Sequence, residues 1–460
     1  MKAWMLCLLL VAVTSTVGIA QQPPLSGEQL TSPTATRALN ATGVEPLPAP
    51  TPSVADSPDI AFANGASLAD LERIALTNNP TMGQAAARVE ATRGHWVQVG
   101  LYPNPTIGYE GTEIGNNGKA GFQGGFISQQ IVTGGKLDLN RAVASQEIDQ
   151  AERQLEVQRF RVTSDVRIQF YSVLVAQRTW ELSSEILKFS EQGLAATVKL
   201  LDAKEISGVE LLQASVESGT AKIELENANQ RYWGAWRRLT AVAGVPGMKP
   251  VRLLGNLESG IPELTWEQSL GRLLATSPEL AATRAGVDRA QWTLTRAEAE
   301  IIPNLELRSG VQHDNSSRYN VANVELALSI PLFNRNQGAI RQAQAELCAA
   351  QADVHRVELD LHHRLATAFE RYAAARNQTE KYSKDILPNS QKALELVTTG
   401  YRKGEFNFLI LLTTQRTYAQ TNLSYINSLR EQWESSIAID NLLLTDSLQN
   451  AGGPSERLNP

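Results

Sequence analysis

Apolar and polar residues alternate along the chain in two different rhythms. In residues 321–330, VANVELALSI, an apolar side chain occupies every second position up to Ile330. This spacing predicts a strand with one apolar face and one polar face. After Pro331 the apolar spacing changes to three and four residues through residues 340–361, which predicts a long helix with one apolar seam. The chain therefore joins a two-faced strand to a coiled-coil helix.

The chain contains two similar halves. LTNNP, which ends at Pro80, matches LATSP, which ends at Pro278, and two Pro-Asn pairs match through Pro103 and Pro303. Further matches follow in the same order, at offsets of 198 to 201 residues. Because chance similarity would not keep both order and spacing, these matches indicate an internal duplication. The two later matches pair Ile131 with Leu332 and Lys204 with Lys403.

Each half is predicted to contain an opening helix, two strands and a very long helical hairpin. Sixty helical residues extend roughly 90 Å at a rise of ~1.5 Å per residue, which predicts an elongated architecture. Pro388 is expected to kink the descending helix of the second half, because proline lacks the N–H of the helical ladder. The opening helices are expected at 67–100 and 266–301, the strands at 106–112, 122–132, 304–312 and 321–330, and the hairpin helices at 137–203, 209–242, 339–386 and 407–444.

The N-terminus has the pattern of a secretory signal. The apolar run MLCLLLVAV follows Lys2, and the small residues GIA precede Gln21. An uncleaved anchor helix is the alternative, but the run is shorter than the ~20 residues that a bilayer requires. The following segment is rich in Pro, Thr and Ser and buries too little apolar surface to become ordered. The predicted domains are a signal peptide at 1–20, a disordered leader at 21–62, the two repeats at 63–250 and 251–446, and a loose C-terminal tail at 447–460.

Composition and motif searches narrow the classes of function. A net charge of -6 leaves no basic surface for nucleic acid. The TGGK stretch that ends at Lys136 lacks the glycine and hydroxyl residues of a phosphate-binding loop, with Gln130 and Leu137 at those places. There is no G-x-S-x-G or H-E-x-x-H motif. We therefore expect no enzymatic activity and no cofactor.

Histidine and cysteine give no strong metal-site pattern. His355, His362 and His363 follow the apolar seam by one or two residues, which favours a solvated helix face over a metal site. Removal of the signal peptide leaves one thiol, Cys348, so an internal disulfide is excluded. We interpret Cys348 as a small core residue.

Four two-faced strands leave two open edges and are too few to close a barrel. With a secretory signal and no later apolar helix of spanning length, we expect several copies to share a barrel in an outer membrane. Three copies would supply twelve strands. A soluble sandwich with the same alternation is the alternative. Aromatic residues near the strands are expected to form interfacial belts; they are Tyr102, Tyr109, Phe122, Phe126, Tyr319 and Phe333.

The order of these motifs resembles the TolC-like outer-membrane efflux proteins. The resemblance covers residues 67–444 and includes GLYPNP at 100–105, two strands, TGGK and a long hairpin, then IPNLEL and IPLFNRNQG. PLFNRNQG at 331–338 resembles the branch that serves cobalt–zinc–cadmium exporters. The family implies a mainly α fold with a transmembrane β-barrel. It also implies a homotrimer whose twelve-stranded barrel, in the outer membrane of a diderm bacterium, continues as an α-helical tunnel in the periplasm.

The resemblance implies the exit duct of a tripartite efflux pump. Such a duct conducts its substrates passively, and the sub-branch implies metal cations as cargo. The implied partners are a periplasmic adaptor (membrane fusion) protein, an inner-membrane pump of the RND type and outer-membrane lipid. Two alternatives stay open. One is a periplasmic coiled-coil scaffold, and the other is the same duct serving organic compounds or type I protein secretion.

The resemblance also places the periplasmic mouth at the two hairpin turns. Glu210 stands where some relatives carry a gating carboxylate, and Asp202 and Glu205 are nearby gate candidates. In the second turn Ile410 and Thr413 replace acids of those relatives, so an apolar constriction is the alternative. Ordinary helix capping would also explain these residues. The candidates for adaptor docking are Lys204, Gly208, Tyr401, Arg402, Gly404 and Glu405.

Overall fold

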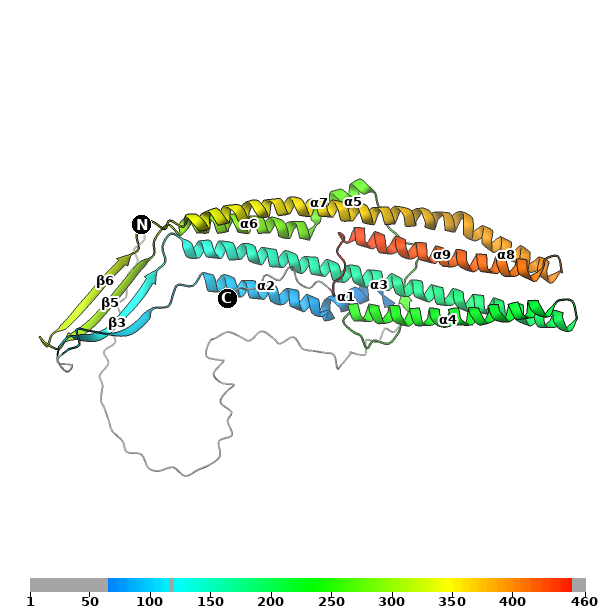
Figure 1. The fold of residues 1–460 in the computed structure, drawn as a ribbon, viewed down its shortest axis with the longest axis horizontal. Helices are drawn as coiled ribbons and strands as arrows, with labels where there is room; N and C mark the ends of the chain where they lie inside the picture. The colour runs from blue at the N-terminus through cyan, green and yellow to red at the C-terminus, as the bar shows by residue number, and fades with distance from the viewer. Residues whose placement is uncertain (1–64, 116–119, 449–460) are drawn as a thin grey trace, which may run out of the picture. The chain divides into compact units, whose positions relative to one another are not determined.

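The computed structural model describes residues 65–115 and 120–448 (Figure 1). The predicted signal peptide at 1–20 and the predicted leader up to residue 62 lie outside the described residues. Ser447, the first residue of the predicted tail, is buried, and its backbone N–H donates to Asp165 Oδ2 (2.6 Å).

The order of elements is the same in the two halves, which confirms the predicted duplication and the mainly α architecture. Helices outnumber strands in both, and each half ends in a long hairpin. The first half contains β1 (Ala66–Ser67), α1 (Leu68–Asn78), α2 (Pro80–Val99), β2 (Thr106–Thr112), β3 (Phe122–Ile131), α3 (Lys136–Asp202) and α4 (Gly208–Val242). The second contains β4 (Leu253–Leu254), α5 (Trp266–Thr276), α6 (Pro278–Ala299), β5 (Leu305–Asp314), β6 (Asn320–Leu328), α7 (Gln337–Lys381), the π-helical turn η3 (Tyr382–Ile386), α8 (Leu387–Arg402) and α9 (Phe408–Asp440).

Each opening helix is broken in two, so the prediction of single helices was wrong. Asn79 and Ser277 lie at the breaks in extended conformation, and each precedes a proline at the first position of the next helix. A residue before proline is disfavoured in helical geometry, and proline is well suited to a helix start. Asn79 Oδ1 also accepts from Thr81 N (3.0 Å), so the side chain caps α2.

The four long strands form one antiparallel sheet in the order β2-β3-β5-β6. In Figure 1 this sheet lies at one end of the helices, and the two hairpin turns lie at the other end. Residues paired across the ladder share a face, and Tyr109, Val324 and Leu326 all project from one exposed apolar face. The opposite face carries Glu110 and Arg308. The predicted two-faced strands are therefore confirmed.

Two of the aromatic residues assigned to interfacial belts lie on the wrong face. Phe126 pairs with Gly108 and Gly310, and Phe122 pairs with Thr112, all on the polar face of the sheet. Alternation alone could not place them, because glycine hides which face of a strand is polar. The prediction of belt positions was thus wrong for Phe122 and Phe126.

The strand ladders also correct the alignment of the two halves. Thr106 pairs with Ser128, and Glu306, which lies 200 positions after Thr106, pairs with Ala327. Since Ala327 lies 199 positions after Ser128, Ile131 corresponds to Ile330 and not to Leu332. The caps of the following helices, Gly135 and Asn336, are nevertheless 201 positions apart and are both left-handed. The second half therefore has two additional residues between its last strand and its long helix.

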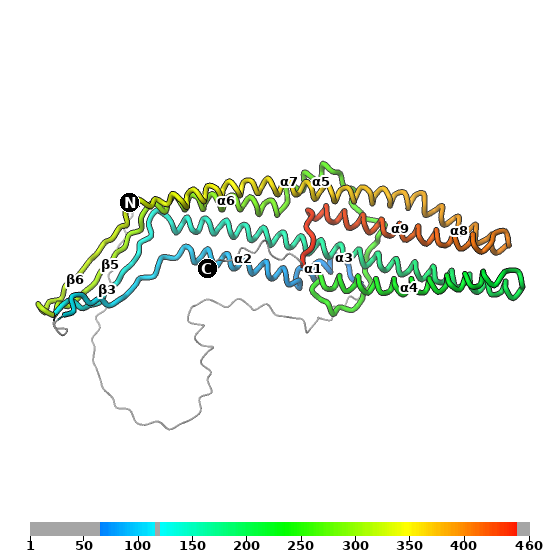
Figure 2. Tube along the Cα trace, viewed as in Figure 1, coloured from blue at the N-terminus to red at the C-terminus, as the bar shows by residue number. Residues whose placement is uncertain are grey.

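The first hairpin packs through small side chains at seven-residue spacing. A seam of small residues lets two helices approach closely. In Figure 2, α4 lies beside the part of α3 that leads to the first hairpin turn. The buried hydroxyls return their hydrogen bonds to their own helix, as Thr197 Oγ1 does to Gly193 O (2.9 Å). The buried small residues are Ala176, Ser183, Ser190 and Thr197 in α3 and Ala214, Ala221, Ala228 and Ala235 in α4.

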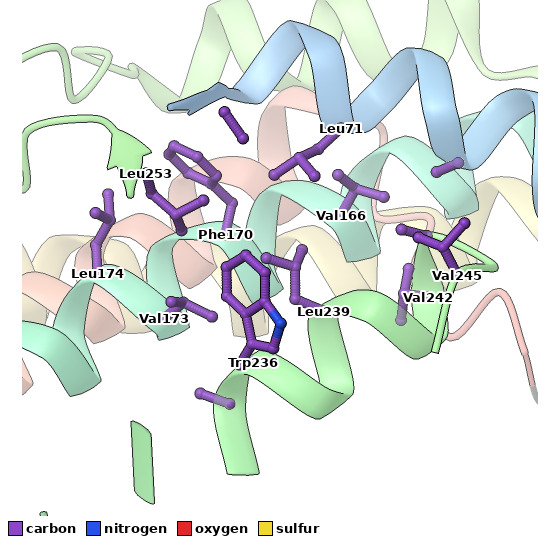
Figure 3. Packing of buried hydrophobic residues seen from close by; sticks show 14 of the residues in the cluster. Leu71, Val166, Phe170, Val173, Leu174, Trp236, Leu239, Val242, Val245 and Leu253 are labelled. Carbon is purple, nitrogen blue, oxygen red and sulfur yellow. The ribbon is translucent and has the colours of Figure 1, made fainter. Parts of the chain in front are cut away.

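A hydrophobic core joins the beginning of each half. Figure 3 shows Trp236 of α4 beside Phe170 of α3, with Leu71 of α1 and Leu253 of β4 close by. Trp236 Nε1 donates to Met248 O (2.9 Å) and so fixes the segment that links the halves. The parallel pairing of β1 with β4 adds a backbone connection at the same place.

The second hairpin departs from regular helix at the predicted place. The π-helical turn η3 ends two residues before Pro388, whose missing N–H and ring prevent regular α-helical bonding. Another prediction was wrong, because Cys348 is exposed and is not a core residue. Among residues 65–115 and 120–448, no helix combines the length and apolarity that a membrane crossing requires.

Candidate functional site at the two hairpin turns

The two hairpin turns have the same backbone geometry. In the first, Glu205 N donates to Leu200 O (2.9 Å) and Lys204 N to Leu201 O (2.9 Å). This pair of bonds is a Schellman motif, whose left-handed residue is Lys204 with φ +60°. The second turn repeats it at Gly404, with φ +76°. Lys204 thus corresponds to Gly404, one position later than the alignment with Lys403 predicted.

The helices that follow the turns start differently. Asn407 caps α9, since its Oδ1 accepts from Ile410 N (3.0 Å). Ser207 occupies the same place before α4 in a similar extended conformation, but its side chain makes no capping bond. Gly208 is the first residue of α4. The first turn is therefore held less firmly at this point than the second.

The charged candidates of the first turn face solvent. Asp202, Lys204 and Glu205 are exposed, whereas Glu210 is half-buried in the first turn of α4. A carboxylate at this position is favoured by the positive end of the helix dipole. Glu210 is therefore the most constrained of the three acidic candidates.

Tyr401 brings the two hairpins together. Its ring lies 6.2 Å from that of Phe408 in α9, and it packs in a cluster with Leu194 of α3 and Ala214 of α4. Burial raises the pKa of the Tyr401 phenol, and the Glu210 carboxylate raises it further. Within the described chain no group meets hydrogen-bond geometry with the phenol oxygen, although a weaker interaction with Thr197 opposes the rise in pKa.

The remaining candidates lie at the tip of the second turn. Arg402, Gly404 and Glu405 are exposed. Phe406 folds back over Gly400, where an added Cβ would lie 2.4 Å from the ring. This glycine is thus needed for close packing of the turn.

Sequence reasoning missed two features that join the hairpins above the turns. Arg416 of α9 pairs with Glu217 of α4 at 2.5 Å. A groove of about 670 Å³ also runs between α3, α8 and α9. In the sequence, the residues of the ion pair and of the groove resemble those of any solvent-exposed helix surface. Only their arrangement in space identifies the two features. The groove is lined by Phe189, Gly193, Leu394, Thr398, Leu411 and Tyr418.

No metal centre accompanies the turns. Among the residues that the structure describes, no group of three His, Cys, Asp or Glu side chains is placed to hold a metal ion. His355 Nδ1 lies 3.5 Å from Glu358 Oε2 on an exposed part of α7.

Comparison with known proteins assigns the fold to a family. Residues 71–245 and 270–443 match the model of the family described as outer membrane efflux protein. The chain belongs to the outer membrane efflux protein family. Membership confirms the resemblance to TolC-like proteins, the transport class and the location in the outer membrane. The roles of individual turn residues stay predictions.

Similar proteins support a closer relationship within the outer membrane efflux family. Cobalt-zinc-cadmium resistance protein CzcC of Cupriavidus metallidurans is 26% identical over 370 residues, covering 80% of this chain and 88% of CzcC. Nickel-cobalt-cadmium resistance protein NccC of Alcaligenes xylosoxydans is 23% identical over 312 residues, covering 65% of this chain and 68% of NccC. A crystal structure of CusC superimposes with a TM-score of 0.70 at 18% identity, covering 82% of this chain and 92% of CusC.

Proposed function

We propose that the protein is the outer-membrane exit duct of a three-part efflux pump and that its cargo is metal cations. The observation that carries the choice of cargo is the similarity to CzcC over most of both chains. The duct itself performs no catalysis and moves cations down the gradient that an inner-membrane pump maintains. An RND-type pump and a periplasmic adaptor protein are the partners.

The fold supports a duct made from three copies. One chain supplies four strands with an apolar and a polar face, and twelve such strands close a barrel with an apolar exterior and a polar lumen. The long helices continue from the same end of the strands and form the wall of a tunnel. The tunnel crosses the periplasm, and its turns form the periplasmic mouth.

The turns and the nearby groove are the proposed docking place of the adaptor. Lys204, Arg402 and Glu405 expose charged groups, and Gly208 and Gly404 leave the backbone accessible. The groove between α3, α8 and α9 opens beside them and includes apolar side chains. An amphipathic helix of the adaptor is the kind of segment that such a groove can bind, because its apolar face lies along a partly apolar track.

Glu210 is the proposed cation-attracting group at the mouth. Three copies would place three such carboxylates around the opening, with Asp202 and Glu205 adding charge at the rim. Ile410 occupies the place of Glu210 in the second turn, so apolar and acidic positions alternate around the ring. An apolar constriction is the alternative for this gate.

A deletion strain tests the proposed cargo. Loss of the gene should lower the minimum inhibitory concentrations of zinc, cobalt and cadmium several-fold. A plasmid copy of the gene should restore the original concentrations. Sensitivity to organic dyes should change little. Unchanged metal sensitivity with increased dye sensitivity would refute metal cations as the cargo and leave the duct in place.

A further inference from the structure

We propose that a pocket at the start of α3 binds the headgroup of a phospholipid that carries both a phosphate and an ammonium group. Arg141 holds the phosphate, and Asp138 holds the ammonium. The pocket has a volume of about 350 Å³, which is in the range of small-molecule sites, and Gly100 and Tyr102 also line it. The inference rests on the outer-membrane location of the family and not on the proposed cargo.

Arg141 offers a guanidinium group that has no acidic partner. Its side chain lies across Gly100, where an added Cβ would collide with Nε, and its guanidinium carbon lies 5.0 Å from the centre of the Trp96 ring. Within residues 65–115 and 120–448, the buried Nε has no hydrogen-bond partner and no carboxylate forms an ion pair with the guanidinium group. A buried donor without an acceptor is costly, so a bound anion stabilises this arrangement. Arginine suits phosphate because its planar fork donates two parallel hydrogen bonds.

Lys136 lines the same pocket, but its ammonium group already has partners. Nζ lies 2.9 Å from Asn304 Oδ1 and 3.5 Å from Glu300 Oε1, and the side chain is only 3% exposed. These contacts join the wall of the pocket to the second half of the chain. Of the two cationic residues that line the pocket, Arg141 is therefore the one available to an anion.

The second half shows that the fold does not require such an arginine. Gly100 corresponds to Glu300 at the offset of 200 positions given by the Pro-Asn pairs. Arg141 corresponds to Gln342 at the offset of 201 positions given by the helix caps. Glu300 pairs with Arg296 at 2.5 Å, so the cation at the end of α6 has its own carboxylate. Because the equivalent junction forms without a stacked and unpaired arginine, Arg141 has a role other than supporting the fold.

The pocket lies at the boundary between the apolar face of the sheet and the helices. Figure 1 shows α3 starting just after β3, whose last residue, Ile131, belongs to the apolar face. Gln129, on the same face, donates from Nε2 to Pro103 O (2.8 Å) and so holds the segment before β2 beside this face. Tyr102 of this segment is 68% exposed. Tyrosine favours the headgroup level of a bilayer, so the pocket lies beside the headgroups of the periplasmic leaflet.

Asp138 explains why the headgroup also carries a positive charge. It lines the pocket together with Arg141, which lies three residues later on α3. Side chains at this spacing lie on one side of a helix, with Cβ atoms about 5–6 Å apart. The Asp138 carboxylate repels an ion that is purely anionic and attracts an adjacent ammonium group. A headgroup with both charges therefore matches the pocket better than phosphate alone.

Native mass spectrometry of the full-length protein, extracted as an oligomer and freed of lipid in detergent, tests the pocket. The probes are phosphatidylethanolamine, which carries phosphate and ammonium, phosphatidylglycerol, which carries phosphate without ammonium, and inorganic phosphate. We expect the wild type to retain phosphatidylethanolamine most strongly. Arg141→Gln should lower the retention of both lipids at least tenfold, and Asp138→Asn should lower the retention of phosphatidylethanolamine only.

Further variants separate lipid binding from folding. Gly100→Ala keeps the arginine but displaces its side chain, so it should lose lipid as Arg141→Gln does. Arg153→Gln and Asp149→Asn remove exposed charges farther along α3 and should retain lipid as the wild type does. Asp138 is exposed, so Asp138→Asn should fold even where changes at Arg141 impair assembly.

Unchanged lipid retention in Arg141→Gln and Gly100→Ala would overturn the pocket as the binding site. Equal retention of the two lipids by the wild type, or an equal loss of both in Asp138→Asn, would overturn the ammonium group as part of the ligand. Displacement of the lipid by an equal concentration of inorganic phosphate would identify a site for free phosphate and overturn the lipid. None of these results needs metal transport, so a failure of the proposed cargo leaves them unaffected.

Discussion

The guanidinium group of Arg308 lies 4.0 Å from the centre of the Phe126 ring on the polar face of the sheet. Arg308 Nη2 also reaches Glu110 Oε2 at 2.7 Å, so one arginine on β5 connects β3 with β2. Glu110 Oε2 accepts in turn from Gln312 Nε2 (3.2 Å), and Gln312 Oε1 accepts from Asn323 Nδ2 (2.9 Å). This network spans all four strands.

Replacement of Arg308 should weaken the sheet. Arg308→Ala removes a cation–π contact of about 0.5–2 kcal/mol and leaves Glu110 without its charged partner. We expect the extracted oligomer to dissociate at a lower temperature in gel-shift measurements. Glu306→Gln, on the same face but outside the Arg308 network, is the control, since glutamine can still accept from Ser128 Oγ. An equal loss in both variants would contradict a specific role for the network.

Because Gly108 has no side chain, the Phe126 ring can pack directly against it. A Cβ at position 108 would lie 2.6 Å from two ring carbons, whereas a Cβ at Gly125 would have backbone at 3.7 Å as its nearest neighbour. Gly108→Ala should therefore reduce assembled protein in the outer membrane several-fold, and Gly125→Ala should not. Adding Phe126→Ala to Gly108→Ala should restore part of the loss. Without that recovery the clash would not be the cause.

Lys204 adopts a conformation that suits glycine. Left-handed geometry costs a residue with a Cβ roughly 1 kcal/mol, and the second turn has glycine at the corresponding place. Lys204→Gly should stabilise the first turn by about that amount, measured as stronger hydrogen-exchange protection of the Glu205 amide, which donates to Leu200 O. Ala203→Gly should have the opposite effect, because Ala203 is right-handed. Equal protection in Lys204→Gly and the wild type would refute the strain.

Gly400 should be intolerant of alanine. Its Cβ would meet the Phe406 ring at 2.4 Å, whereas a Cβ at Gly193, nine residues before the end of α3, would meet nothing within 4 Å. Gly400→Ala is expected to speed proteolysis at the second turn. Gly193→Ala should stabilise α3 by about 0.5–1 kcal/mol through helix propensity. Slower cleavage of the Gly400 variant would show that Phe406 can move away at little cost.

Glu210 can be tested in planar bilayers. Glu210→Gln should reduce the preference for cations, measured as a smaller reversal potential in a potassium chloride gradient, because the half-buried carboxylate loses its charge. Glu224→Gln changes an exposed carboxylate of the same helix and should have a smaller effect. If both variants keep the reversal potential of the wild type, the apolar constriction at Ile410 is the better interpretation.

Much of the fold could be predicted from the sequence because its elements are long and periodic. The alternation in β6 and the absence of proline in α3 were sufficient to place both elements within a few residues. The breaks at Asn79 and Ser277 were missed because apolar periodicity continues across them. The capping residue and the following proline were the local signals of a break. Their effect on the backbone outweighed the apolar periodicity and ended the helix.

The arrangement of the turns could be predicted less well. Lys204 and Gly404 correspond through backbone geometry. The sequence alignment was wrong by one position because it paired Lys204 with Lys403, the neighbour of Gly404. The cluster of Tyr401 with Phe408, Leu194 and Ala214 joins residues from four helices, which no local pattern reveals. The left-handed Lys204 also has no sequence signal, since lysine rarely adopts that conformation.

Glu210 and Ile410 hold the same place in two turns of one polypeptide. The proposed trimer has two hairpin turns per chain and therefore six turns around its mouth. If the six turns came from identical repeats, every substitution would appear at all six. In this chain a single codon change alters only every second position of such a ring. In the proposed duct, a substitution can therefore change one half of the mouth and leave the duplicated half as it was.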